Sequence, residues 1–477
     1  YSAMGAFTTG NNNVVIGYEA GDDMTSAGGS VLIGYEAGSK LTTSGEGVFI
    51  GEYAGQNSTN GTNVFIGARA GRGNVANPVG LYCVAIGYMA MQTPVGNSNI
   101  AIGYQAMKDT DAGSNSDSSQ NNIAIGYQSM GGTWADAQSN YNVAIGDYTM
   151  DSALDGAIYN TAIGSSALSG ITTGDHNVAL GYNAGQNMTT GLYNVIIGSQ
   201  AGDAASIGNY HVLIGAFAGS AINAGDADGT TAIGYQAGQI LTSGVGSTAI
   251  GYQALLKANH ADADHNVAIG NGVGTELLNG YYNVLIGYNT GNTLTSGGEN
   301  TLIGHNNDVA SGDNTNNIII GNGLTASDND NRVYIGNDSS YIYNDFNSNA
   351  TWTHSSDERQ KKEIKDDILG LDFINDIRPV TFKHKSPSEF PKEWNAYNAD
   401  DKEPMGGDKR IHGLIAQEVK QALDNQGIDT FGGWGEEDDG RQHISFEAFV
   451  LPLINSVKEL TEIVKSQQKE IEELKKK

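Results

Sequence analysis

Asn142-Val143-Ala144-Ile145-Gly146 is one copy of the short motif that decides the fold of this chain. The Ile-Gly or Leu-Gly pair that ends the motif recurs 19 times in this context, and nine of the 18 intervals between its glycines equal 17 residues. A fixed period of this length indicates a solenoid, in which each repeat forms one turn and contacts its neighbours. The repeat glycines are Gly17, Gly34, Gly51, Gly67, Gly87, Gly103, Gly126, Gly146, Gly164, Gly181, Gly198, Gly215, Gly234, Gly251, Gly270, Gly287, Gly304, Gly321 and Gly336.

Each motif reads as a short β-strand. The residue three before the glycine is Val, Ile or Thr in every copy, and the residue directly before it is Ile in all copies except Leu180. These two side chains share one face of a strand, because side chains alternate. β-Branched residues suit such a pleated, packed surface. The chain is therefore predicted to be mainly β.

The residue between them is apolar as well, so both faces of the strand are predicted to be buried. It is Ala in nine copies and charged in none. Strands without a polar face are typical of sheets that are covered on both sides. We expect one face to line the interior of the solenoid and the other to pack on sister chains, with the small alanines letting backbones approach. The sequence predicts an elongated parallel β-solenoid that assembles side by side, most simply as a homotrimer.

Two polar positions recur beside the strand. Asn stands four residues before the glycine in 12 copies, and stacked turns would join these amides into a ladder. Tyr follows the glycine nine times, as at Tyr18, Tyr104 and Tyr235. This row is either a structural stack at a corner or a strip on which carbohydrate stacks.

The composition excludes several functions. A net charge of −28 over 477 residues disfavours nucleic acid as a partner. Membrane insertion is not expected, since no apolar run reaches about 18 residues. The single Cys83 provides no disulfide framework. The chain begins at Tyr1 without a methionine, so we expect a fragment or a processed product.

No metal site or cofactor is expected either. Asp226-Ala227-Asp228 and Asp262-Ala263-Asp264 follow no calcium-loop pattern and read as solvated turns. The nine histidines show no zinc spacing, and no phosphate-binding loop is present. The longest repeats carry the loops Asp109–Asn121 and Gly131–Asn140, and loops on a rigid scaffold often hold binding residues.

The chemistry of the chain changes near residue 350. The first 350 residues contain 27 acidic and 6 basic side chains, a net of −21, and the remaining 127 contain 26 and 19, a net of −7. We predict a repeat shaft over 1–345, a linker over 346–355, a small α+β domain over 356–447 and a C-terminal helix over 448–477. A polar helix is expected to begin at Ser355–Asp357.

The region after 354 resembles a known family. The motifs are Ser356-Asp357-x-Arg359-x-Lys361, Arg378-Pro379-Val380-x-Phe382, His412-Gly413-Leu414-Ile415-Ala416-Gln417-Glu418-Val419 and Leu451-Pro452-Leu453. In this order they resemble the C-terminal intramolecular chaperone of phage tail fibres, tailspikes and endosialidases. The repeats are similar to those of trimeric adhesins and phage fibres.

The resemblance implies a domain that trimerises the preceding fibre and then cleaves itself off. It assigns Ser356 as the nucleophile and Lys361 as its general base, with the bond between Ser355 and Ser356 as the scissile one. This chemistry is reasonable, because a serine hydroxyl needs an adjacent base and a desolvated lysine can supply it. Asp357 and Arg359 belong to the motif and are expected to orient the turn. The alternative is that Ser356 caps a helix and Lys361 is a solvated charge.

The C-terminal residues have coiled-coil spacing. Apolar side chains recur at heptad positions a and d, interrupted by one glutamine, which predicts a trimerising coiled coil or an amphipathic helix packed on its own domain. The residues are Val457, Leu460, Val464, Gln467, Ile471 and Leu474.

These features together predict a fibre. The leading hypothesis is an extracellular, homotrimeric tail fibre of a phage or phage-like particle, joined to an upstream particle component and binding a host cell-surface receptor, for which a glycan is one candidate. A secreted bacterial surface adhesin with the same terminal domain is the second hypothesis, and a polysaccharide depolymerase is the third.

Overall fold

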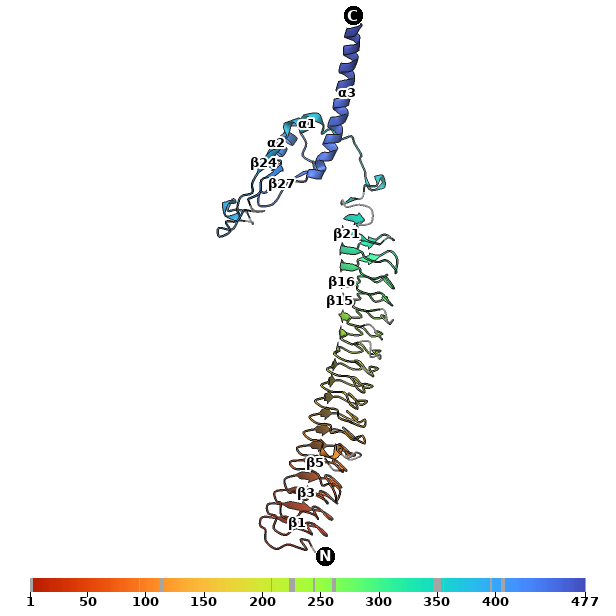
Figure 1. The fold of residues 1–477 in the computed structure, drawn as a ribbon, viewed down its shortest axis with the longest axis vertical. Helices are drawn as coiled ribbons and strands as arrows, with labels where there is room; N and C mark the ends of the chain where they lie inside the picture. Colours follow the sequence, from red (N-terminus) through yellow and green to blue (C-terminus); the bar gives the residue numbers. More distant parts are fainter. Residues whose placement is uncertain are drawn as a thin grey trace. The chain divides into compact units, whose positions relative to one another are not determined.

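The computed structural model describes residues 3–93, 95–110, 115–206, 208–222, 228–242, 245–259, 263–328, 330–345, 353–354, 356–394, 397–404 and 408–476. The chain divides into two compact units, Tyr1–Ser355 and Ser356–Lys477 (Figure 1). Each unit has its own hydrophobic core.

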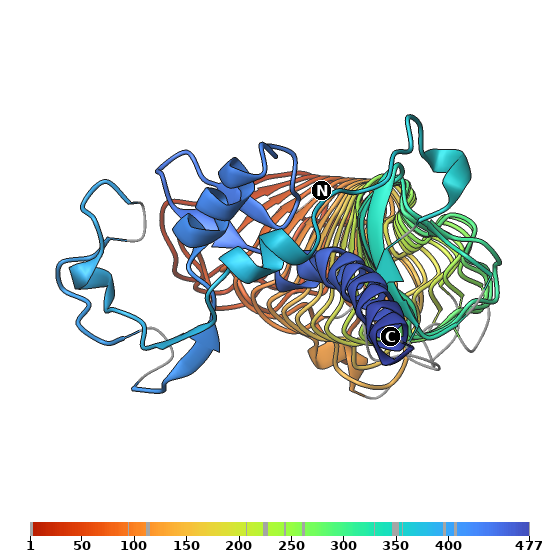
Figure 2. The ribbon, with the colours of Figure 1, turned by 90° about the horizontal axis from the view of Figure 1, so that it is seen from above.

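The first unit is a parallel β-solenoid, as the repeats predicted. Its turns lie over one another when viewed along the solenoid (Figure 2). Each of the 19 motifs forms one strand, and consecutive strands pair in parallel, with Val143 opposite Thr161 and Ile145 opposite Ile163. The parallel strands are β1 (Val14–Ile16), β2 (Val31–Ile33), β3 (Val48–Ile50), β4 (Val64–Ile66), β5 (Val84–Ile86), β6 (Ile100–Ile102), β7 (Ile123–Ile125), β8 (Val143–Ile145), β9 (Thr161–Ile163), β10 (Val178–Leu180), β11 (Val195–Ile197), β12 (Val212–Ile214), β13 (Thr231–Ile233), β14 (Thr248–Ile250), β15 (Val267–Asn271), β16 (Val284–Tyr288), β17 (Thr301–His305), β19 (Ile318–Asn322) and β21 (Arg332–Asn337).

Short elements complete this unit. The 3₁₀ helix η1 (Ser116–Ser118) lies in the longest repeat, and β18 (Asp308–Val309) pairs with β20 (Thr325–Ala326). At the end of the shaft, β21 pairs antiparallel with β22 (Ser340–Asp345), which pairs in turn with β23 (Thr353–His354). These antiparallel strands cover the last parallel edge, which would otherwise present unpaired backbone groups.

The structure corrects which face of the strand lies inside. The small middle residue lines the interior, and Ala144 is fully buried. The β-branched residues face outward instead: they are half-buried in most strands, and only at the terminal strand do Val14 and Ile16 reach 47% and 59% exposure. The expectation that alanines would bring neighbouring chains together was therefore wrong. The outer face of the sheet is the Val/Ile face, made by the first and third residues of each strand.

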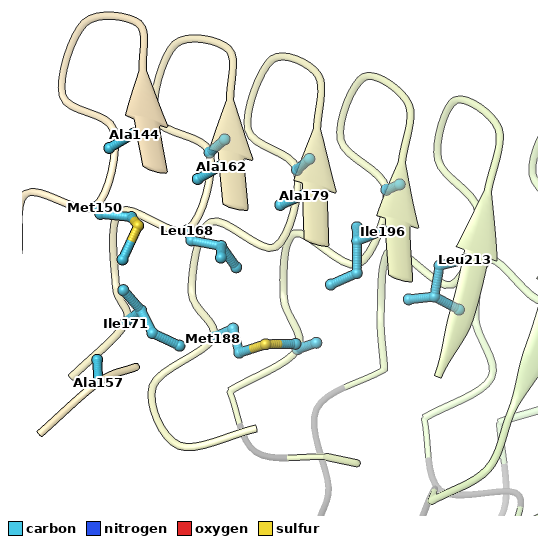
Figure 3. Close-up of a cluster of buried hydrophobic side chains, with 14 of the residues drawn as sticks. Ala144, Met150, Ala157, Ala162, Leu168, Ile171, Ala179, Met188, Ile196 and Leu213 are labelled. Atoms are coloured by element: carbon cyan, nitrogen blue, oxygen red, sulfur yellow. The ribbon is translucent and has the colours of Figure 1, made fainter. Parts of the chain in front are cut away.

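The alanines are small because another side chain of the same turn fills the interior. Where the middle residue is Ala144, the residue six positions later is the buried Met150 (Figure 3). Where the middle residue is the larger Phe65, that later position is Gly71, and a Cβ there would lie 2.4 Å from the Phe65 ring. Several turns thus conserve core volume by pairing a small residue with a large one.

The repeat asparagines form the predicted ladder inside the shaft. Asn177 donates from Nδ2 to Asn160 Oδ1 at 3.0 Å and to the Gly191 carbonyl at 2.7 Å. Asn194 repeats the first contact with Asn177 at 2.9 Å. These side chains are fully buried, so the ladder satisfies polar groups that would otherwise destabilise the core.

The repeat glycine is required by backbone geometry. Gly146 has a φ of +135°, and a Cβ on it would lie 2.7 Å from the carbonyl oxygen of Gly164 in the next turn. Both the positive φ and the close approach of the two backbones exclude a larger residue.

The second unit is a small α+β domain with a long C-terminal helix. Its core contains Phe373, Val419, Leu423 and Phe449. Its elements are η3 (Glu358–Gln360), α1 (Leu371–Asp376), β24 (Val380–Phe382), η4 (Pro387–Glu389), β25 (Ile411–Gly413), α2 (Ala416–Asn425), β26 (Trp434–Glu436), β27 (Gln442–Ile444), η5 (Phe446–Phe449) and α3 (Val450–Lys475). Strands β24 and β25 pair antiparallel, as do β26 and β27.

Candidate functional site

The predicted serine and lysine lie side by side at the start of the second unit. Lys361 Nζ donates a hydrogen bond to Ser356 Oγ over 2.7 Å. Both side chains are exposed. Ser355, which would supply the carbonyl of the predicted scissile bond, lies outside the described residues. The contact has the geometry of a nucleophile and its base, but a base must accept the hydroxyl proton, which requires the neutral amine.

The backbone between the two residues is a single 3₁₀ turn. Asp357 caps η3 by accepting from the backbone N–H of Arg359 at 2.9 Å. The expected polar α-helix is therefore absent, and the chain leaves η3 in an extended conformation at Lys361. This tight turn brings two side chains five residues apart within hydrogen-bonding distance.

Asp357 and Arg359 form an ion pair across this turn. The Arg359 guanidinium contacts the Asp357 carboxylate at 2.6 Å and 3.0 Å. The hydrogen bonds from the Arg359 side chain and backbone lower the pKa of the Asp357 carboxyl below its ordinary value. Both residues are exposed, so this ion pair orients the loop and adds little stability.

Helix α3 anchors the segment that follows the serine–lysine pair. Glu459 Oε2 accepts the backbone N–H of Leu371 at 2.9 Å, at the beginning of α1. Asn455 Nδ2 donates to the carbonyls of Asp367 and Leu369, both at 3.1 Å. Sequence reasoning missed these contacts, because they join residues at least 86 positions apart and belong to no motif.

The same helix presents apolar side chains that its own domain does not cover. Its first part packs on α1, and the heptad residues beyond it are exposed. Near the base of the helix, an apolar cavity of about 420 Å³ is lined by Ile374, Phe446, Phe449 and Leu453, among others. The exposed residues are Val450, Leu451, Leu453, Ile454, Val457, Leu460, Ile463, Val464, Ile471 and Leu474.

On the shaft, the tyrosines that follow the repeat glycines form stacks. The rings of Tyr88, Tyr104 and Tyr127 lie 5.4 Å and 5.0 Å apart, with interplanar angles of 19° and 6°. Their neighbours therefore occupy the ring faces on which a sugar would stack. This geometry favours the structural interpretation of the row.

A second aromatic row lies five residues before the glycine and was not anticipated. Tyr141, Tyr159, His176, Tyr193 and Tyr210 stack in sequence, with centroids 4.9–5.6 Å apart. The tyrosines of this row are 46–60% exposed. The recurrence of aromatic residues at a fixed offset from the glycine is the signal that could have revealed it.

Metal and membrane sites are not found among the described residues. No group of three or more His, Cys, Asp and Glu side chains is placed to hold a metal ion there. Asp226, Ala227 and Asp262 of the acidic clusters lie outside those residues, whereas Asp228 and Asp264 accept backbone N–H groups at 2.7 Å. Within the part of the chain that is described, no helix is suited to crossing a bilayer.

Comparison with known proteins supports the family resemblance. Residues 356–428 match the family model described as "Chaperone of endosialidase". The second unit carries an endosialidase-type chaperone domain. The match begins at Ser356 and includes Lys361, Arg378 and Glu418. In this chaperone domain Arg378 forms an ion pair with Glu418 of α2 at 2.5 Å. No curated protein and no solved structure was found to match the chain.

Proposed function

We propose that this chain is the fibre protein of a phage or phage-like particle, that it assembles as a homotrimer, and that it attaches the particle to a host surface outside the cell. The observation that carries the proposal is the combination of a chaperone domain with a solenoid whose Val/Ile face is left uncovered by its own chain. A sister chain packed on that face would bury a continuous apolar surface, which is the main favourable term in association.

The chaperone domain is proposed to drive this assembly. The exposed apolar residues of α3 recur at the spacing of a coiled coil, and three such helices would bury them against each other. The helix is 26 residues long and its seam includes Gln467, so the contacts of the rest of the domain would add to the association.

Self-cleavage before Ser356 is proposed to release the chaperone domain. A lysine acts as a general base only as the neutral amine, and burial favours that form. Lys361 is exposed in the single chain, so packing of another chain around the turn would have to exclude water before Ser356 reacts. Cleavage would then follow assembly.

The test is the fate of Ser356→Ala during expression. The parent chain is expected to yield fragments 1–355 and 356–477, resolved by denaturing electrophoresis and mass spectrometry, whereas Ser356→Ala and Lys361→Ala stay full-length. Lys362→Ala is the matched control, because it removes a neighbouring exposed lysine that has no contact with Ser356, and it should cleave normally. Equal cleavage of the parent and Ser356→Ala would show that Ser356 and Lys361 do not catalyse the cleavage.

Attachment is tested with the intact protein on cells. The labelled trimer is expected to bind a candidate host, and treatment of the cells with glycosidases should reveal whether the receptor is a glycan. Release of oligosaccharide from the treated surface by the protein itself would favour a depolymerase instead.

A further inference from the structure

The longest turns of the shaft enclose a polar groove that none of the features above uses. Its volume is about 470 Å³, and four successive turns line it. Asn77, Asn97, Asp117, Gln120 and Gln138 supply most of its polar side chains. The repeat intervals in this region are 20, 16, 23 and 20 residues, so the groove lies where the chain departs most from its period.

Hydrogen bonds fix the walls of the groove. Asn77 Nδ2 donates to Asp117 Oδ2 at 2.8 Å and joins loops 40 residues apart. Asn97 Oδ1 accepts the backbone N–H of Leu81 at 2.8 Å. The backbone N–H of Gln120 donates to Asn140 Oδ1 at 2.7 Å. A groove whose walls are already held by hydrogen bonds loses less conformational entropy when a ligand binds.

Several polar groups remain available inside it. Within the described residues, the side-chain amides of Gln120 and Gln138 and the Nδ2 of Asn97 have no hydrogen-bond partner. A primary amide offers two donors and an acceptor, which matches hydroxyl groups that both donate and accept. Asp117 is the one charged residue of the lining, and the shaft is acidic, so anionic ligands are disfavoured.

The second aromatic row is interrupted in the four turns that line this groove, although neither of its tyrosines there belongs to the lining itself. Tyr82 and Tyr141 occupy its slots in the outer two of four turns, and Ser98 and Asn121 occupy the two between them. Three strand spacings separate the two tyrosines, which is about 14 Å. Tyr141 stacks on Tyr159 with one face only, and Tyr82 stacks on no ring among the described residues.

Tyr82 is the most exposed tyrosine of this row, at 65%. Its φ of +59° is a property of the repeat, because Ser98, Asn121 and Tyr141 have the same left-handed conformation in this slot. What distinguishes Tyr82 is that its ring stacks on no other ring among the described residues, so packing within the shaft does not explain it.

We propose that this groove binds a neutral oligosaccharide. Sugar hydroxyls would pair with the amides of Gln120, Gln138 and Asn97 and with Asp117, and the apolar face of a sugar ring would lie on Tyr82 or Tyr141. The inference deepens the attachment function proposed above by giving the receptor-binding site and the chemical class of its ligand.

The test is an array of neutral and anionic oligosaccharides probed with the assembled full-length protein, followed by titration of the strongest neutral sugar. Gln120→Ala/Gln138→Ala and Tyr82→Ala should each weaken that binding at least tenfold. Gln186→Ala/Gln239→Ala and Tyr182→Ala are the controls, because they remove glutamines and an exposed, unstacked tyrosine elsewhere on the shaft. Thermal unfolding should show that all variants remain folded.

The outcomes separate this inference from the proposed function. If the parent binds a neutral sugar and the groove variants bind it equally well, the groove is not the binding site. The proposal that the protein attaches to glycans is then still supported. If the parent binds only anionic sugars, or no sugar, the groove inference is overturned, and binding of the protein to host cells then decides whether attachment itself survives.

Discussion

Each asparagine of the buried ladder serves the turn that follows it. The Oδ1 of Asn160 accepts both the backbone N–H and the side-chain Nδ2 of Asn177, each at 3.0 Å. A turn that lacks an asparagine interrupts this pattern. His211 takes the slot after Asn194 and is fully buried. Among the described residues, no hydrogen bond of normal geometry reaches either of its ring nitrogens.

His211 should therefore make the shaft sensitive to acid. Burial lowers the pKa of its imidazole below the ordinary value, although the nearby Asp228 carboxylate and a backbone contact with Thr230 oppose this effect. Below a pH of about 6.5 the histidine binds a proton more readily in the unfolded chain than in the folded chain. The free energy of unfolding therefore decreases as the pH is lowered. We predict that His211→Asn raises stability and flattens its dependence between pH 7 and pH 5, measured by urea unfolding.

The control for this prediction is His176→Asn. His176 is an exposed member of the second aromatic row, so its substitution leaves the buried ladder intact. If the parent and His211→Asn lose stability in parallel as the pH falls, the buried histidine is not the cause.

At the scale of the strand, the sequence predicted the repeat, the parallel register and the asparagine ladder, because each follows from a fixed period. It did not predict which face points inward, since Ala144 and its neighbours Val143 and Ile145 are all apolar. That choice depends on Met150, whose side chain fills the interior of the turn next to the alanine. A small residue in the strand is balanced by a large one later in the same turn, and this pairing can be recognised only once the folded turn brings the two positions together.

The half-exposed Val/Ile face gives a sharp test of self-association. Ile145→Lys/Ile197→Lys should abolish the proposed trimer and leave a folded single chain, because a lysine is tolerated in water but costly in an apolar interface. Light scattering after size-exclusion chromatography measures the assembly, and circular dichroism measures the fold. Thr173→Lys/Thr190→Lys adds the same charge at exposed turn residues and should stay trimeric. A trimeric Ile145→Lys/Ile197→Lys variant would show that this face is not required for assembly.

For the whole molecule, the motifs around Ser356 and Lys361 were enough to predict the family of the terminal domain. They also predicted that these two side chains lie close together. The contacts that support them were beyond sequence reasoning. Asn455 and Glu459 come from the helix that was expected to serve assembly, yet they also hold the chain that leads from the serine–lysine turn to α1. Such long-range contacts follow from the closed fold and leave no local pattern.

This double use of α3 predicts a link between assembly and cleavage. Leu460→Lys/Val464→Lys places two charges on its exposed apolar seam, so the variant should remain a single chain. Because Lys361 is exposed in the single chain, the variant should also stay uncleaved although Ser356 and Lys361 are intact. Cleavage and oligomeric state are read from the same preparation by electrophoresis and light scattering. Ser466→Lys/Gln468→Lys adds two lysines at exposed positions off the seam and should assemble and cleave normally. A variant that is monomeric but fully cleaved would mean that the turn alone activates Ser356, and the neighbouring chains would then serve only to hold the fibre together.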